Sequence, residues 1–554
     1  MGYYGGNFRN RGAEDNKKML IAIAVSMLFL TVWSNIFSPS DEELLRHQEQ
    51  QKAEQQIKNA AKQEVAQQQT KSTLKPQKNV YLETKTAQFA VDVNNNRISY
   101  ATLKNYKQHE GSLANVILLD ENHYIEAGIL GESRDIDWKI EKQTTDSITL
   151  KGQKNGLNYR TKYTFDDNYI VHISQEVVSE KEPRKLANYV RIFSKDTKDR
   201  VENSYAWRGV LLMNNDNIKE ITYDDVKKNN IENKTSQDGW IGFSDQYWLT
   251  ALIDNDGQRE LKTYAARYNK DRDSYQIDFL NAEKSVAKGQ TFKSESVIFV
   301  GPKRLEHLQY VADKYKIQKF DKAIDFGMFY FISKPLLIIL KKLYVLSGNF
   351  GVAIILLTIL VRMIIFPLAN RSYKATARMK NVAPKLKELK ETYANDRRAL
   401  QMATYELYKQ ENINPMSAIV PMLFQIPVFF ALYKVLVISI EMRDAPFIGW
   451  IVDLSSKDPT SIFNLFGLLP YEVPAFLQIG VLPIFMGLTM FVQQLMTPMP
   501  QMDKSQQKIF KWMPIILTFI LAPMPAGLVL YWSCSNIFTI IQQSVIFKLS
   551  KTSK

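Results

Sequence analysis

One arginine lies inside a long apolar run. Arg362 is the single charged residue of GVAIILLTILVRMIIFP, which covers residues 351–367. If a bilayer span runs from 349 to 368, Arg362 lies about six residues from its basic end, roughly 9 Å below the membrane surface. An arginine at that depth either extends its stem to the interface or faces protein and water instead of lipid. The run by itself leaves both interpretations open.

Further polar side chains lie in the neighbouring apolar runs. Thr358 precedes Arg362 by one helical turn, and Gln425 lies between two prolines in the next run. In the last run, four residues at 4-3-4 spacing share one helix face: Trp532, Asn536, Thr539 and Gln543. Such residues either join helices by hydrogen bonds or line a hydrated cavity. An arginine and a polar stripe in the same half of the predicted bundle favour the cavity.

The segment 371–414 is both basic and periodic. Its apolar residues follow the 3-4-3-4 spacing of a heptad seam: Met379, Val382, Leu386, Leu389 and Tyr393. Asn395 and Asp396 predict a turn, after which a second helical seam continues at Leu400, Ala403 and Leu407. The pattern predicts a helical hairpin.

The basic residues of this hairpin favour an anionic partner. They include Arg371, Lys374, Arg378, Lys380, Lys385, Lys387, Arg397 and Arg398. Docking of RNA, a ribosome or anionic phospholipid is one interpretation. The other is a solvated face that only follows the excess of Lys and Arg in cytoplasmic loops.

Composition limits the chemistry. The chain has 554 residues, with 71 Lys and Arg against 57 Asp and Glu, a basic balance that suits an anionic surface. The single cysteine, Cys534, excludes an intramolecular disulfide framework, and its apolar surroundings predict an inert thiol. The sequence contains no HExxH, P-loop or GxGxxG motif, so we expect no metal, no cofactor and no enzymatic activity.

The N-terminal region predicts a membrane anchor followed by a tether. Residues 1–18 form a basic leader, and 19–37 are mostly apolar without a small-x-small cleavage site, which indicates an uncleaved signal anchor. Residues 38–77 are rich in Gln, Glu, Lys and Ala and predict a polar tether.

Residues 78–319 predict a large antiparallel β-sandwich. Phe89, Val91 and Val93 alternate before an Asn triplet, and Asn155-Gly156 is a strong hairpin signal. Further strand-like runs cover 189–193, 240–253, 259–267 and 291–300. No catalytic cluster stands out, so a binding or scaffolding domain is expected.

The rest of the chain predicts a polytopic α-helical membrane protein. Residues 320–348, with Lys334-Pro335 in their centre, predict an amphipathic helix on the outer membrane surface. We expect five further spans, at 349–368, 416–437, 473–496, 509–523 and 526–547. The loop 369–415 contains ten Lys and Arg, whereas 438–472 contains two. Loops 369–415 and 497–508 and the tail 548–554 are therefore expected in the cytoplasm, and 438–472 outside.

Several motifs together resemble the YidC-type membrane protein insertases. They are LVRMIIFPL, the basic hairpin, INPMSAIVPMLFQIPVFFALY, DAPFIGWIVDLSSKDP and PAGLVLYWSCSN, in the order of that family. The N-terminal anchor and the β domain resemble its Gram-negative form, with a large periplasmic domain in the cell inner membrane. The resemblance covers essentially the whole chain.

The resemblance implies a core of five transmembrane helices around a hydrophilic groove, closed on the outer side. It assigns the groove arginine to Arg362, its neighbour to Thr358, and substrate contacts to Ile426 and Phe429. An aromatic pair matches Tyr531 and Trp532. The second aromatic of that pair is usually Tyr, so a hydroxyl role at Trp532 is in doubt, and the outer loop around 464–474 is longer than usual.

The implied function is transfer of nascent membrane proteins from ribosome to bilayer without nucleotide hydrolysis, alone or with the Sec translocon. Implied partners are the ribosome, the translocon with its accessory subunits, the signal recognition particle and its receptor, and anionic phospholipids, with the protein acting as a monomer. One alternative is a solute transporter whose Arg362 binds an anion, although no internal repeat is visible in the sequence. Another is a chaperone whose active part is the β domain.

Overall fold

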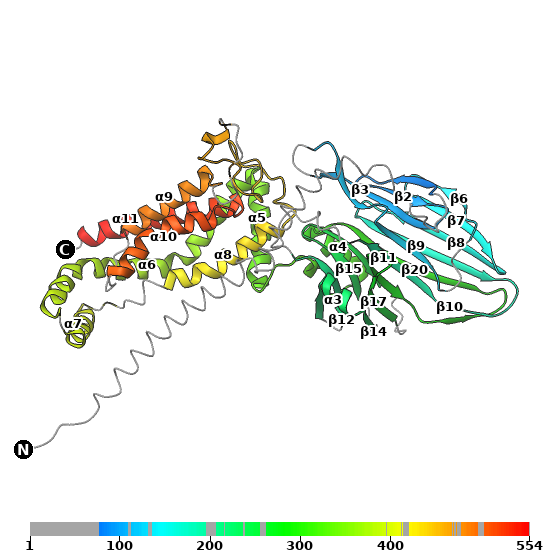
Figure 1. Ribbon diagram of the computed structural model, residues 1–554, viewed down its shortest axis with the longest axis horizontal. Coiled ribbons are helices and arrows are strands. Elements are labelled where there is room, and N and C mark those ends of the chain that lie inside the picture. The colour runs from blue at the N-terminus through cyan, green and yellow to red at the C-terminus, as the bar shows by residue number, and fades with distance from the viewer. Residues whose placement is uncertain are drawn as a thin grey trace, which may run out of the picture. The chain divides into compact units, whose positions relative to one another are not determined.

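The computed structural model describes residues 77–554, apart from 109–111, 131–135, 196–206, 215–216, 236–238, 255–261, 395, 412, 414–419, 468, 470–472, 474–477, 497–503 and 553–554. The predicted leader, the anchor and all but the last residue of the tether lie outside this range. A β domain comes first and a set of helices follows (Figure 1).

The β domain contains two antiparallel nine-stranded sheets and a strand pair, β10 (Arg184–Leu186) with β19 (Lys284–Val286). The first sheet has the strand order β1-β2-β3-β5-β11-β18-β17-β14, and β4 pairs with β3 outside this order. Its strands are β1 Asn79–Glu83, β2 Ala87–Asp92, β3 Arg97–Lys107, β4 Asn115–Leu119, β5 His123–Ile129, β11 Asn188–Ser194, β14 Ile231–Thr235, β17 Lys262–Asn269 and β18 Ser274–Leu280. The second has the order β13-β12-β15-β16-β20-β9-β8-β7-β6: β6 Lys139–Gln143, β7 Ser147–Lys154, β8 Leu157–Phe165, β9 Ile170–Ser179, β12 Gly209–Asn214, β13 Asn217–Ile221, β15 Trp240–Ser244, β16 Trp248–Ile253 and β20 Thr291–Pro302.

The predicted hairpins are confirmed. Asn155 and Gly156 join β7 to β8 with φ angles of 53° and 77°, the left-handed pair that a two-residue hairpin turn requires. The Asn-rich turn joins β2 to β3, with a register shift between Ala90 and Val91. The expected single run 240–253 is two strands, because Asp245 Oδ1 accepts hydrogen bonds from the amides of Tyr247 and Trp248 and turns the chain.

The two large sheets pack against each other through aromatic side chains. Phe89 on β2 stacks on Phe165 on β8 with 4.4 Å between ring centroids, and both are buried. Tyr163 on β8 donates a 3.0 Å hydrogen bond to the carbonyl oxygen of Asn96 in the β2–β3 turn. The core of the β domain therefore lies between the sheets, as alternating strand residues predict.

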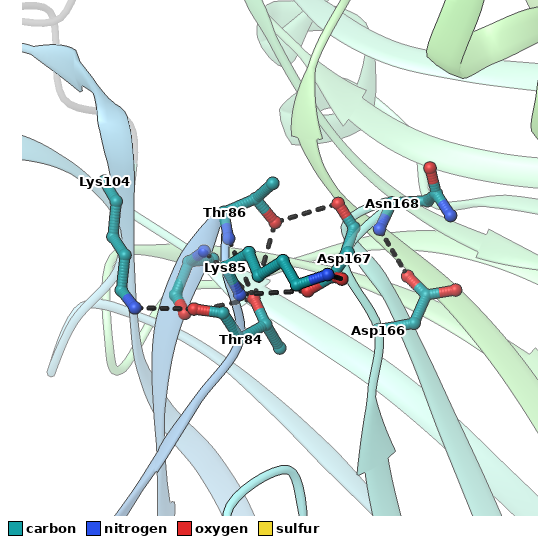
Figure 2. A network of polar contacts seen from close by, with 8 residues as sticks. Thr84, Lys85, Thr86, Lys104, Asp166, Asp167 and Asn168 are labelled. Atoms are coloured by element: carbon teal, nitrogen blue, oxygen red, sulfur yellow. Dashed lines mark hydrogen bonds and ion pairs between the residues drawn. The ribbon is translucent and has the colours of Figure 1, made fainter.

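Polar contacts join the sheets at one end. The β1–β2 turn meets the β8–β9 turn, where the Lys85 amide donates to Asp167 Oδ1 at 2.9 Å and Thr86 Oγ1 donates to the Asp167 carbonyl at 2.9 Å (Figure 2). Lys104 Nζ donates to the Thr84 carbonyl at 2.5 Å. Asp167 is half exposed, so these bonds are expected to fix turn geometry more than to add stability.

Among the described residues, two helices interrupt the region that the sequence predicted to be mostly strands. The first, α3 (Tyr223–Lys228), has a capping box between Thr222 and Asp225. The second, α4 (Leu305–Tyr315), buries residues at helical 3-3-4 spacing: Leu305, Leu308, Val311 and Tyr315. That spacing was a visible helix signal which the strand prediction missed.

The expected helix at 320–348 is shorter than predicted. A 3-10 turn, η2 (Phe320–Ala323), buries Phe320 against Trp240 and Phe299 of the second sheet. The chain leaves helical geometry at Ile324, which is extended, and passes through Gly327, whose φ is 68°, before α5 runs over Tyr330–Ser347. Burial of Phe320 in the β domain is why the helix cannot begin there.

The described residues after α5 form six more α-helices and a short η4 at Leu465–Gly467. The helices are α6 Phe350–Thr392, α7 Arg397–Gln410, α8 Val420–Ile438, α9 Val481–Met496, α10 Lys504–Leu521 and α11 Ala526–Thr552. Length and composition identify one stretch in the described part that could cross a membrane by itself, Phe350–Met379 of α6. Three shorter apolar stretches are Phe424–Ile438, Val481–Met496 and Phe510–Leu521.

The largest correction concerns α6. The sequence predicted a span ending at 368 and a separate hairpin helix, but one helix of 43 residues continues through Pro367 and Pro384. It continues because Ala369 and Tyr373 pack against Ile546 of α11, which extends the helix contact beyond the predicted end. The predicted span and the first arm of the basic hairpin are therefore one element.

The other predicted boundaries also shift. The helix expected at 473–496 begins at Val481, since residues 478–480 are not helical. The spans expected at 509–523 and 526–547 are helices α10 and α11, which extend to Lys504 and to Thr552. The break predicted at Pro523–Pro525 lies between these two helices, as expected.

Candidate functional site

Arg362 reaches from α6 to α11. Its Nη2 donates to the carbonyl oxygen of Ser535 at 3.0 Å and to the Ser535 hydroxyl. The side chain is half-buried, and its Nε is buried without a hydrogen-bond partner among the described residues. A guanidinium with an unused donor in an apolar setting favours an additional acceptor, from water or from a ligand.

Two pairs of predicted site residues lie together between α8 and α11. Gln425 Nε2 donates to Tyr531 Oη at 2.6 Å, and Tyr531 is 2% exposed. One turn further along α8, the ring of Phe429 packs edge-on against Trp532, with 4.8 Å between centroids. Ile426 lies between them on α8 and is half-buried. Residues about 100 positions apart in the sequence thus form two adjacent contacts between α8 and α11, one amide–hydroxyl hydrogen bond and one aromatic pair.

The predicted polar stripe of α11 contacts more than one neighbour. Trp532 faces Phe429 of α8, whereas Asn536 Nδ2 donates to Thr489 Oγ1 of α9 at 3.0 Å. Thr539 Oγ1 donates to the Ser535 carbonyl at 2.9 Å, within its own helix. At Asn536 and Thr539 the observed bonds are those of helix packing.

Gln543 and Thr358 are buried in different ways. Gln543 is 3% exposed, and its Oε1 has no hydrogen-bond partner within the described range. Thr358 is fully buried and donates to the carbonyl of Ile354 at 2.7 Å, one turn back in α6. The Thr358 hydroxyl therefore has its hydrogen-bond partner within α6, whereas Gln543 Oε1 can accept a hydrogen bond from water or a ligand.

Two contributors were missed by the sequence reading. Ser535 accepts hydrogen bonds from Arg362, and Thr489 accepts one from Asn536. Ser535 lies four residues after Tyr531 and four before Thr539, so the helical spacing pointed to it. No spacing in the sequence could relate Thr489 to Asn536, because they lie on different helices.

The basic hairpin is built on a buried apolar seam. Met379, Val382 and Leu386 of α6 pack with Leu407, Tyr408 and Ile413, and Leu389 packs against this cluster. Tyr393 is exposed and Leu400 and Ala403 are half-buried, so the seam ends earlier than predicted. Asp396 caps α7 by accepting from the amides of Arg398 and Ala399, both at 3.0 Å.

Most of the predicted docking residues point to solvent. Arg371, Lys374, Arg378, Lys387 and Arg398 are exposed. Lys385 is also exposed and pairs with Glu411 at 2.8 Å, which raises the lysine pKa above its ordinary value. The side chains of Lys380 and Arg397 lie outside the described part.

One connecting segment binds the first residues of three helices. The Phe447 carbonyl accepts from Asn349 Nδ2 at the start of α6, at 2.9 Å. Asp458 Oδ2 accepts from the Leu482 amide of α9 at 2.8 Å, and the Ser456 carbonyl accepts from the Ala526 amide of α11 at 2.7 Å. Helices α6, α9 and α11 therefore begin at the same end of the bundle.

Metal-ligating side chains do not cluster in the part that the structure describes. No group of three or more His, Cys, Asp or Glu side chains there could hold a metal ion. Cys534 is half-buried and unpaired. The chemistry available at α6, α8 and α11 is that of hydrogen bonding, one cationic charge and apolar contact.

Comparison with known proteins assigns both parts of the chain. Residues 79–339 match the family described as "YidC periplasmic domain", and residues 342–553 match "60Kd inner membrane protein". A protein of Brucella suis named "Membrane protein insertase YidC" is 41% identical over 492 residues, which cover 85% of this chain and 80% of that one. One of the same name from Mesorhizobium japonicum is 36% identical over 582 residues, covering 97% and 96%.

A solved structure, "Active YidC insertase crystal structure with the first transmembrane domain resolved", covers 85% of this chain and 93% of its own at 15% identity, with a TM-score of 0.35. The two family matches show that the fold combines an antiparallel periplasmic β domain with a helical membrane core. The identities, which extend over most of both chains, show that this protein belongs to the YidC family of membrane protein insertases, a non-enzymatic family of the inner membrane.

Proposed function

We propose that nascent transmembrane segments enter the bilayer along a hydrated groove formed by α6, α8 and α11. The observation that carries this proposal is the state of Arg362. Its guanidinium is held by Ser535 but keeps a buried, unpartnered Nε, and Gln543 Oε1 on α11 is also unpartnered within the described residues. Buried polar atoms of this kind are costly unless water or a polar ligand reaches them.

In this mechanism Arg362 attracts the acidic tail or loop of a passenger. The attraction is stronger in a medium of low dielectric constant than in bulk water. The apolar passenger segment then moves past Phe429 and Tyr531 into lipid. Burial of about 20 apolar residues in the bilayer supplies the free energy without nucleotide hydrolysis. Family membership favours this insertion route over solute transport.

The proposed topology has six spans, with both termini in the cytoplasm. Helices α6, α9 and α11 begin at one end, where the segment 447–458 binds them. Basic residues lie at the opposite end, along the second half of α6 and at Lys548 and Lys551 of α11. The positive-inside rule therefore assigns that end to the cytoplasm and the segment 447–458 to the periplasmic side. This segment would close the groove on the outer side.

The hairpin of α6 and α7 is proposed as the docking site for the ribosome, the Sec translocon and its accessory subunits, or the signal recognition particle and its receptor. Its exposed cations are carried on a rigid support, because the seam around Leu386 and Leu407 is buried. Anionic phospholipid is a further ligand of the same chemistry. The α5 helix, with Phe331 and Val345 exposed, is proposed to lie on the outer membrane surface.

The test of the groove replaces Arg362 with Ala and with Lys. Insertion of a single-span passenger with an acidic periplasmic tail is measured in proteoliposomes. We expect Ala to slow insertion by about tenfold, equivalent to about 1.4 kcal/mol, and Lys to restore part of the rate because it keeps the charge.

The control is the same passenger with its tail acids changed to Asn and Gln. Its insertion should depend much less on Arg362. Equal losses for the acidic and neutral tails would show that Arg362 acts through packing. Normal insertion of the acidic passenger by Arg362→Ala would overturn electrostatic capture.

A further inference from the structure

Hydrogen bonds join the beginning of the connection that leads into α9, at Asp458 and Thr460, to the first residues of that helix. Asp458 is 5% exposed; its Oδ2 accepts from the Leu482 amide at 2.8 Å, and its Oδ1 accepts from the Thr460 amide at 2.9 Å. Thr460 Oγ1 accepts from the Val481 amide at 3.0 Å. Asp458 and Thr460 thus satisfy the first amides of α9 from more than 20 positions earlier in the chain.

Gly480 makes this close approach possible. A Cβ atom at position 480 would lie 2.3 Å from Cγ of Asp458, nearer than side-chain atoms approach. The Ile462 amide also donates to the Ile479 carbonyl at 3.2 Å, next to the contact between Thr460 and Val481. The two ends of the connection are therefore held together, and the described residues 463–467 and 469 lie between them.

The described part of this loop exposes apolar side chains. Leu465 and Phe466 are 51% and 56% exposed, and Ile462 and Leu469 are 39% and 40% exposed. Leu465 and Phe466 have φ angles of 49° and 61°, a left-handed conformation that is unfavourable for bulky residues. Hydrogen bonds hold it, from the Phe466 amide to the Ser461 carbonyl at 2.8 Å and from the Leu469 amide to the Asn464 carbonyl at 3.0 Å.

The charge pattern of the loop suits lipid. Between Asp458 and Gly480 the sequence contains one charged residue, Glu472, and no Lys or Arg. A loop that faced only water would leave four large apolar side chains exposed at a cost in free energy. The same side chains are stabilised when they enter the boundary of a bilayer.

The length of α9 indicates where the loop lies. The 16 residues described as α9 span about 24 Å at about 1.5 Å per residue, most of a hydrocarbon core about 30 Å thick, and residues 497–503 after them lie outside the described part. Residues next to its first turn therefore lie at the level of the membrane boundary. In Figure 1 the orange segment before α9 projects to the side of the helices at this end.

We propose that the described residues of the loop 461–469, which leave out 468, insert Ile462, Leu465, Phe466 and Leu469 into the outer leaflet and anchor the start of α9 to phospholipid. The proposal rests on the orientation proposed above, with the start of α9 on the periplasmic side. It gives the extended outer loop of this chain a role separate from the passenger route.

The test places one fluorophore on the loop. In a Cys534→Ala background, Phe466→Cys is labelled with a polarity-sensitive fluorophore and the protein is reconstituted in phosphatidylethanolamine–phosphatidylglycerol vesicles. We expect blue-shifted emission and a loss of emission when phospholipids with a spin label on the acyl chain are included. The control is Leu113→Cys, which is 95% exposed in the β domain and should lose emission only to aqueous iodide.

Quenching of position 466 by iodide and not by spin-labelled lipid would overturn the proposal. Protection from both quenchers would also overturn it, since the loop would then be covered by protein. Leu469→Cys repeats the measurement if Phe466→Cys does not fold.

Failure of the orientation is detected separately. A membrane-impermeant maleimide added to intact spheroplasts should modify Leu113→Cys and spare Arg398→Cys. The reverse pattern would overturn the proposed topology, whatever the fluorophore at position 466 reports.

Discussion

The amide of Gln425 and the hydroxyl of Tyr531 form a 2.6 Å hydrogen bond that joins α8 to α11. Both residues were expected at a groove on separate grounds, one as a mid-span polar residue and one through the family resemblance. Their contact brings together two residues that were selected on independent grounds. The bond occupies one amide hydrogen of Gln425 and one acceptor site of the Tyr531 hydroxyl.

The first prediction concerns this pair. Tyr531→Phe should destabilise the protein by about 0.5–1.5 kcal/mol, because the half-buried Gln425 amide loses its acceptor. Adding Gln425→Leu should recover much of the loss, since both polar partners are then gone. Thermal unfolding in detergent measures the two effects. A double variant as unstable as the sum of the single variants would contradict the coupling.

The second prediction concerns the hold on Arg362. Ser535→Ala removes the hydroxyl acceptor but leaves the carbonyl, so insertion of an acidic passenger should fall less than with Arg362→Ala, by about twofold to fivefold for a bond of about 0.5–1 kcal/mol. Ser533→Ala is the matched control, because Ser533 is buried and donates only to Val529 of its own helix. Equal rates for both variants would show that Ser535 does not orient Arg362.

The third prediction is a pH dependence in the β domain. Burial lowers the pKa of Lys303 to about 8, and its Nζ lies 3.1 Å from Ser244 Oγ. The unfolded lysine keeps a pKa of about 10.4, so between about pH 8 and pH 10 the unfolded state binds more protons. Stability of the β domain should therefore rise with pH across that window.

Lys303→Met should remove this rise. At pH 7 it should also stabilise the domain, because a buried charge is replaced by an apolar side chain of similar length. Unfolding midpoints of the parent and the variant at pH 7 and pH 9 provide the measurement. A rise of the same size in both proteins would assign the pH dependence to another group.

The fourth prediction concerns the base of the outer loop. Gly480→Ala should destabilise the start of α9 by about 1–3 kcal/mol, because the new methyl group overlaps Asp458. Chymotrypsin should then cleave after Phe466 more rapidly than in the parent. Unchanged cleavage of Gly480→Ala would show that the Asp458 contact does not order the loop.

The sequence by itself determined the elements whose signals are local. Asn155-Gly156 predicted a hairpin because only certain residues adopt its positive φ angles, and the heptad spacing from Met379 to Leu386 predicted the buried seam of α6. Arg362 stood out because a charge within an apolar run is costly wherever the run is placed. Family motifs then related these residues to membrane insertion.

The tertiary structure decided what depends on distant neighbours. Only packing of Ala369 and Tyr373 on Ile546 of α11 shows that α6 continues beyond its apolar run. Thr489 becomes a partner of Asn536, and Asp458 a cap for α9, through contacts between segments more than 20 residues apart. Such pairings arise from the fit of whole helices, because their energy is shared among many contacts. These pairings cannot be predicted from the spacing of residues along the sequence.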